Sequence, residues 1–179
     1  MLEKSDEKPG LKSEAASSVR GRAIGATTKL AAGAAVTVDT FTTLAALSGM
    51  YEIQAAEIAL RRTRRDDVKE FAHTVIEDHK ELGRKLASCM QAMKTPKSPP
   101  DALDPMHQIL VNDLEGASDE NFDKRYVSQQ QAAHDTAITL FRTYRDFGAD
   151  AELRNLARQG LPLLERHMEM VRNMKGAHA

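Results

Sequence analysis

The 179-residue sequence has no tryptophan, a single cysteine and few aromatic side chains, which make up 4% of its residues. Strands are rich in aromatic and β-branched residues, so this scarcity argues against a β-rich fold. Alanine, leucine and methionine supply the apolar residues instead, and they favour helices. The lone Cys89 excludes a disulfide within the chain, and we expect a structural or surface role for it. The composition therefore predicts an all-α protein.

The sequence also lacks an excess of charge and a long apolar run. Its formal net charge is −1, which gives no electrostatic reason to expect nucleic acid as a partner. The one basic cluster lies at a predicted helix–helix turn, where solvated arginines are expected: Arg61, Arg62, Arg64 and Arg65. No segment reaches the ~20 consecutive apolar residues of a membrane helix. Neither a nucleic-acid-binding protein nor a membrane-spanning one is predicted.

The first 37 residues are rich in serine, glycine, alanine and charge, and we predict a flexible tail over residues 1–37. The bundle domain is predicted over residues 38–175. An apolar stretch at 30–38 is similar to the centre of a signal peptide, but the residues before it are too many and too acidic. The absence of a clear export signal favours a cytoplasmic location. A translation start downstream of Met1 is the alternative.

Four long amphipathic helices are predicted from apolar residues that recur every three or four positions. The first spans about 38–63, and Asp66 is expected to cap the second after a very short turn. The third begins near Ser118, and Asp150 caps the fourth. Pro162 lacks an N–H and predicts a kink in this last helix. The pattern predicts a four-helix bundle of the ferritin-like kind.

A long connection over residues 95–117 joins the second and third of these helices. Its prolines end the second helix and prevent its continuation. The connection is long enough to return along the whole bundle, as in ferritin-like proteins, although an up-down-up-down topology is the alternative. Four apolar residues at helical spacing predict a short helix within it: Met106, Ile109, Leu110 and Leu114.

Each predicted long helix places one titratable residue on its apolar face. Glu52 lies seven residues after Ala45 and seven before Ala59, inside the stripe of the first helix. Counting from the two helix–helix turns puts Glu52 and its counterparts on the other three helices near the middle of the bundle. The counterparts on the third and fourth helices, His134 and His167, differ in depth by about one helical turn. Asp78 borders the stripe of the second helix. The corresponding residues of the other three helices are His79, His134 and His167.

Buried carboxylates and imidazoles are costly unless each has a partner. A transition metal supplies that partner, and imidazole with carboxylate suits iron, zinc, copper or manganese. No glutamate stands three residues before any of the three histidines, so the standard di-iron pattern is incomplete and a mononuclear or differently arranged site fits better. We expect the metal to be held by Glu52, Asp78, His79, His134 and His167, with Asp78 as a ligand or an orienting residue.

Two other functions are alternatives to a metal-binding protein. The buried residues can form a Glu–His network that satisfies itself and sets the register of a non-catalytic structural or interaction protein. A redox enzyme acting on oxygen or peroxide is the third hypothesis, and it rests on fold analogy alone. A homo-oligomer stays open. Residues off the apolar faces are expected in solvent: Glu57, His73, His107 and His178.

Four spaced segments resemble a bacterial ferritin-like family catalogued as domain of unknown function 4142. They are LSGMYEIQAAEIAL at 47–60, VKEFAHTVIEDHKEL at 68–82, FDKRYVSQQQAAHDTAITLF at 122–141 and LPLLERHMEM at 161–170. The resemblance spans about residues 40–175. It implies the same fold but no established reaction; a role in metal or oxidative stress is expected from the metal-binding hypothesis. Family members are commonly exported.

The resemblance also implies which residues carry the family pattern. It places an acidic residue at Glu52, an Asp–His pair at Asp78 and His79, and a tyrosine at Tyr126. It further implies a second Asp–His pair ending at His134, and a Leu-Pro followed by His167. Ala133 stands where the family commonly has the second Asp, so a weakened or altered site is expected if that carboxylate contributes.

Overall fold

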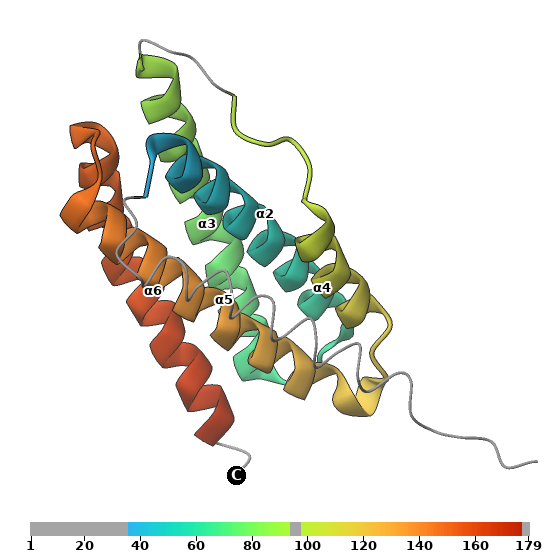
Figure 1. Ribbon diagram of the computed structural model, residues 1–179. Coiled ribbons are helices and arrows are strands. Elements are labelled where there is room, and N and C mark those ends of the chain that lie inside the picture. Colours follow the sequence, from blue (N-terminus) through green and yellow to red (C-terminus); the bar gives the residue numbers. More distant parts are fainter. Residues whose placement is uncertain (1–35, 94–97, 177–179) are drawn as a thin grey trace, which may run out of the picture. The chain divides into compact units, whose positions relative to one another are not determined.

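The computed structural model describes residues 36–93 and 98–176 (Figure 1). Within these ranges all regular secondary structure is helical, and no strand occurs. Residues 1–35 fall outside the described ranges, so the flexibility predicted for the tail stays a prediction. The helices are α2 (Val38–Arg62), α3 (Asp66–Ala92), α4 (Pro105–Glu115), α5 (Asp119–Phe147) and α6 (Ala151–Gly176).

Short polar side chains fix where several helices begin. The Thr37 side chain accepts a hydrogen bond from the backbone N–H of Thr40 at the start of α2. Asp104 does the same for His107 at the start of α4, and the predicted cap Asp150 accepts from Leu153 at the start of α6. Each bond satisfies a backbone donor that the first helical turn leaves free.

Pro162 lies inside α6 without ending it. A proline removes one backbone hydrogen bond, and both Pro162 and Arg158, whose carbonyl loses its partner, are exposed to solvent. Water can therefore bond to that carbonyl, and the apolar face of α6 holds the helix in place on both sides of the proline. The predicted kink at this position stays a prediction.

Contacts between helix ends give the directions of the long helices. Arg62, the last residue of α2, donates to the carbonyl of Ala117 and to Asp119 at the start of α5. At the other end, Phe41 of α2 stacks on Tyr144 of α5 with ring centroids 4.1 Å apart. α2 and α5 are therefore antiparallel. Because the tight turn at 63–65 makes α2 and α3 antiparallel as well, α3 and α5 run in the same direction (Figure 1).

The four long helices form a helical bundle in which α2 packs on α3 and α5, and α6 packs on α5 and α3. The short helix α4 packs mainly on α2 and also touches α5. It covers a second apolar face of α2, where Tyr51 and Ile58 join Val111 and Leu114 of α4 in the buried core. The apolar spacing of α2 predicts a single inner face, so the burial of Tyr51 was not predicted.

Gly148, which ends α5, is required for space. Its φ of −63° is open to any residue, so the conformation does not demand glycine. A Cβ at this position would lie 2.5 Å from both the ring and the carbonyl oxygen of Tyr144. Glycine at this position therefore lets the chain pass close to Tyr144 where α5 ends.

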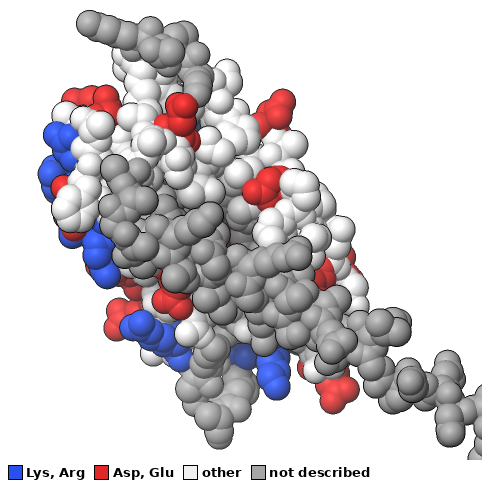
Figure 2. Space-filling view, viewed as in Figure 1, with Lys and Arg blue, Asp and Glu red and all other residues white. Residues whose placement is uncertain are grey.

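The described surface carries both signs of charge, and Figure 2 shows Lys and Arg side chains beside Asp and Glu on the visible face. Several of these charges are paired, for example Arg61 with Glu115 and Arg142 with Glu165. Among the described helices, none combines the length and apolar character needed to cross a membrane.

Candidate metal centre

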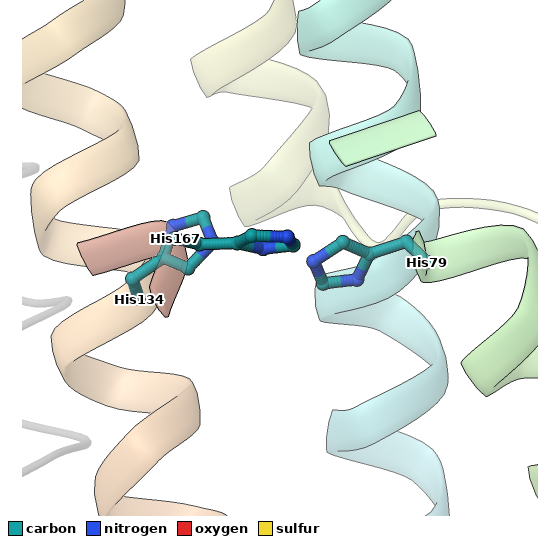
Figure 3. A group of neighbouring side chains, drawn as sticks. All are labelled: His79, His134 and His167. Carbon is teal, nitrogen blue, oxygen red and sulfur yellow. The ribbon is translucent and has the colours of Figure 1, made fainter. Parts of the chain in front are cut away.

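Three imidazoles from three helices converge in the middle of the bundle. His79 comes from α3, His134 from α5 and His167 from α6, and the three rings point toward one another (Figure 3). All three residues are buried, and each offers one nitrogen such that these atoms lie within 4.8 Å of one another. The three histidines are therefore a candidate group of metal ligands.

Glu52 of α2 lies against this cluster and has no exposed surface. Its Oε2 is 3.0 Å from Nε2 of His79, and its Oε1 is 3.4 Å from Nδ1 of His134. Neither oxygen receives a hydrogen bond of good geometry from the described part of the chain, in spite of these short distances. A fully buried carboxylate with two poorly directed partners is costly unless a cation is nearby.

The electrostatics of Glu52 reflect that environment. Burial by itself raises the pKa of the carboxyl group, but the neighbouring imidazoles of His79 and His134 outweigh it and lower the pKa to about 2. Burial likewise opposes a proton on His79, yet the Glu52 carboxylate raises the pKa of His79 above its ordinary value. The two residues thus favour the ion pair over the neutral pair.

In His134 and His167, the ring nitrogen that points away from the cluster, called here the outer nitrogen, bonds a hydrogen-bond acceptor. Nδ1 of His134 lies 2.9 Å from the carbonyl oxygen of Gln130, one turn earlier in α5. Nε2 of His167 lies 2.8 Å from Oδ2 of Asp78, which also accepts from Arg166 at 2.5 Å. A carbonyl and an ionised carboxylate only accept, so these two ring nitrogens carry the hydrogens.

The inner nitrogens of this pair are therefore both lone-pair acceptors in the neutral rings. Nε2 of His134 and Nδ1 of His167 face each other at 3.2 Å. Two acceptors at this distance repel unless a proton or a cation lies between them. Burial opposes the proton on His167, and it lowers the pKa to about 4, with the hydrogen bond to Asp78 acting in the other direction. The geometry therefore favours a cation at this point.

The structure brings all five sequence-predicted site residues together. Glu52 and the three histidines form the buried cluster, and Asp78 lies behind His167 with its side chain 26% exposed to solvent. Asp78 therefore occupies the position of an orienting residue, one step outside the imidazoles. It connects the buried centre with Arg166 at the surface, where the side chain is 57% exposed.

The role of Gln130 was not predicted from the sequence. This residue is fully buried, and its carbonyl fixes the orientation of the His134 ring. The available signal was its position four residues before His134, which places both on one face of the helix. Its side-chain amide atoms have no hydrogen-bond partner among the described residues, and the hydroxyl of Tyr126, another four residues back, also has none. Buried polar groups thus continue along α5 from the cluster.

The residues expected in solvent divide into three cases. Glu57 and His73 are exposed, as predicted. The prediction was wrong for His107, which is half-buried: it pairs with Asp104 at 2.8 Å and its ring packs on Tyr51 at 5.5 Å between centroids. The reason is that α4 lies on α2, so a residue off the inner stripe of α4 still meets the bundle. His178 lies outside the described residues.

Ala133 offers no carboxylate beside His134. It is a partly buried residue that packs against the apolar core. The Gln130 carbonyl provides the acceptor that His134 needs, so the orientation of this ring does not depend on an acidic neighbour. The centre thus has one carboxylate within the cluster, Glu52, and one behind it, Asp78.

The fold and this centre together define the class of the protein: a helical bundle with a histidine–carboxylate cluster in its core. The model of the family described as "Domain of unknown function (DUF4142)" matches residues 25–174, and the chain belongs to this family. The match begins within the predicted tail.

Among solved structures, a DUF305 fragment from Deinococcus radiodurans has a similar fold. The TM-score is 0.67 at 17% sequence identity, with 76% of this chain and 93% of that chain covered. At this identity the similarity concerns the fold alone. The comparison with curated proteins gives no match.

Proposed function

We propose that this protein binds one transition-metal ion at the centre of a ferritin-like four-helix bundle. His79, His134, His167 and Glu52 are the proposed ligands, and Asp78 orients His167. The bundle is of the crossover type, because α3 and α5 run in the same direction and the chain between them must return to the end where α3 began. A role in metal or oxidative stress would follow from such a site.

The observation that carries this proposal is the pair of facing nitrogens of His134 and His167, 3.2 Å apart. Nitrogen ligands of a tetrahedral zinc ion at 2.0–2.1 Å are roughly 3.3 Å apart, so this pair already has nearly the spacing of two metal ligands. The acceptors behind each ring, Gln130 and Asp78, are the kind of outer partner that ligating histidines usually have.

The donor set narrows the choice of metal. Three imidazoles and one carboxylate suit zinc, copper, iron or manganese, whereas calcium and magnesium prefer oxygen ligands throughout. Cys89 does not belong to the cluster, and the donor set contains no sulfur. The affinity of such a site for divalent metals generally rises from manganese through iron to copper and is lower for zinc. Which ion is bound in the cell therefore also depends on which metals are available.

A polar core without metal is the second candidate, and the Glu52–His79 contact favours it. An imidazolium beside this carboxylate gives a charge-balanced pair at 3.0 Å. A proton shared between His134 and His167 would then satisfy the remaining lone pairs. In this case the cluster specifies how the helices pair and binds nothing.

Metal content decides between the two candidates. We expect close to one equivalent per chain in protein purified without chelator, or after loading with zinc, copper, iron or manganese, and a melting temperature that rises with metal concentration. His79→Gln should reduce both effects strongly. His73→Gln is the matched control, because His73 lies on the same helix but is exposed. Less than a tenth of an equivalent, with no thermal shift for any of the four metals, would contradict the proposal.

A further inference from the structure

A pocket of about 260 Å³ opens beside the centre, on the side of His79. Its walls come from α2 and α3, with Phe141 of α5, Leu156 of α6 and the prolines at 99 and 100 completing them. Among the described residues that line it, the only charged or polar side chain apart from His79 is that of Lys80, which is exposed. The pocket is therefore an apolar hollow whose buried polar group is one imidazole.

His79 differs from the other two histidines in the environment of its outer nitrogen. His134 and His167 each bond an acceptor with theirs. The one ion-pair contact of His79 within the described residues is made by Nε2, and Nδ1 is not among the fully buried atoms that lack a partner. Its inner nitrogen, Nε2, is the one that faces Glu52. The residue is 4% exposed and lines the pocket, and its Nδ1 lies on the side of Gly49, which lines the pocket as well.

Gly49 keeps this nitrogen accessible from the pocket. A Cβ at position 49 would lie 3.6 Å from Nδ1 of His79, at ordinary van der Waals distance. An alanine would therefore fit without displacing the backbone, and its methyl group would cover the nitrogen. A glycine inside a helix lowers helix stability, so its presence here has to be explained by something other than helix formation.

We propose that the pocket binds a small uncharged molecule with an apolar body and one hydroxyl group, which hydrogen-bonds Nδ1 of His79. The described lining residues include no acidic side chain that could balance a cation, and a carboxylate would lose its hydration against apolar walls. A hydroxyl group suits either state of the ring, since it can accept from Nδ1–H or donate to a bare Nδ1. Cavities of about 150 Å³ already admit benzene, so the size is sufficient.

This site does not require a metal in the centre. With a metal on Nε2 the other ring nitrogen carries a hydrogen, and without one it can do either. The pocket would then place the ligand in contact with the imidazole that faces Glu52, next to the bundle core but outside the cluster of facing nitrogens.

Phenol is a suitable probe, tested on the full chain after metal removal and again after loading. We expect saturable binding by ligand-observed NMR and a phenol-induced shift of the His79 ring nitrogens in ¹⁵N-labelled protein. Toluene has the same shape but no hydroxyl group, and it should bind at least about fivefold more weakly because it makes no hydrogen bond to Nδ1. Benzoate should not bind. Phenol that does not saturate below about 10 mM would overturn the proposal.

Two glycine variants test the position of the site. Gly49→Ala should weaken phenol binding at least tenfold, because its methyl group covers Nδ1. Gly83→Ala is the matched control: Gly83 also lines the pocket, but nothing lies within 4 Å of a Cβ there, so binding should stay within about twofold. Both variants should raise the melting temperature, which shows that they fold. Equal phenol affinity in the two variants would place the ligand elsewhere. Metal content measured on the same samples separates this test from that of the proposed function.

Discussion

Asp78 and His167 are joined by a 2.8 Å contact that links the buried centre to the protein surface. The carboxylate fixes the hydrogen of His167 on Nε2 and so directs the Nδ1 lone pair at His134. Arg166 holds the other side of the same carboxylate oxygen. A residue outside the cluster thereby decides which nitrogen of His167 is free to bind a metal.

Replacing Asp78 should therefore weaken metal binding without removing a ligand. We expect Asp78→Asn to lower metal affinity roughly 10–100-fold, since outer-shell partners of ligating histidines have effects of this size. Glu77→Gln is the control, because Glu77 is the exposed neighbour on α3. Competition titration with a chelating dye measures both. An unchanged affinity in Asp78→Asn would mean that the tautomer of His167 is fixed in some other way.

Acid should destabilise the metal-free protein through His167. Its pKa is lowered to about 4 in the folded state, mainly by burial, from an unfolded value near 6.5. The unfolded state therefore binds the proton first, and stability is complete above pH 6.5 and falls as pH drops from 6.5 toward 4. His79 does not affect this interval, because its folded pKa is raised and its contribution is lost only as pH rises above 6.5.

The expected loss between pH 6.5 and 4 is about 3 kcal/mol, at 1.36 kcal/mol per pKa unit. Urea unfolding at a series of pH values measures it, and His167→Asn should flatten the curve. The interval above pH 4.5 is the informative one, since Glu52, with a pKa lowered to about 2, stays ionised there and loses its contribution only as pH falls from 4.5. A curve of equal slope in wild type and His167→Asn would refute this assignment.

Glu52 and His79 should behave as a coupled pair in the metal-free protein. Removing one partner leaves the other buried without compensation, so Glu52→Leu and His79→Leu should each cost about 3–5 kcal/mol. The double variant should be less destabilised than either single variant, because an apolar pair replaces an ion pair of 3.0 Å. Denaturant unfolding of the four proteins gives the coupling energy, and simple additivity would show that the two residues do not interact.

Arg62 should contribute far more to stability than its neighbour Arg61. Its guanidinium donates to the carbonyl oxygens of Leu114 and Ala117, at 2.7 and 2.6 Å, and so caps the end of α4. Arg62→Leu removes both bonds and leaves the Leu114 carbonyl with the longer one, 3.2 Å, from the backbone N–H of Ala117, so we expect a loss of about 2–3 kcal/mol. Arg61→Leu breaks only an exposed pair with Glu115 and should cost less than about 1 kcal/mol. Equal losses in thermal unfolding would show that the cap has no special weight.

The long helices were predictable because their apolar residues repeat at helical spacing and their turns are short. The first was predicted over 38–63 and is observed as α2, Val38–Arg62. The second face of α2 was not predictable, because it depends on where α4 packs. Tyr51 and Leu47 belong to no single stripe with Glu52, yet both are buried.

The composition of the cluster was also predictable, but its internal geometry was not. Counting along the chain placed His134 and His167 about one turn apart in depth, whereas their nitrogens lie 3.2 Å apart. Side chains lean toward the N-terminus of their own helix, and in an antiparallel pair they lean in opposite directions. Here the side chains of His134 and His167 lean toward each other, which removes the difference in depth between their helix positions. The hydrogen-bond acceptors behind the rings could not be predicted, because ring rotation leaves no trace in residue spacing.

The centre is divided between the two halves of the chain. Glu52, Asp78 and His79 come from α2 and α3, while His134 and His167 come from α5 and α6, so the contacts Glu52–His134 and Asp78–His167 both cross from one half to the other. Slippage of one half along the other by a single helical turn, about 5.4 Å, would separate both at once. Such misassembly would leave charged groups without partners in an apolar interior, at a high cost in free energy. The buried cluster therefore favours the correct alignment of the two halves during folding.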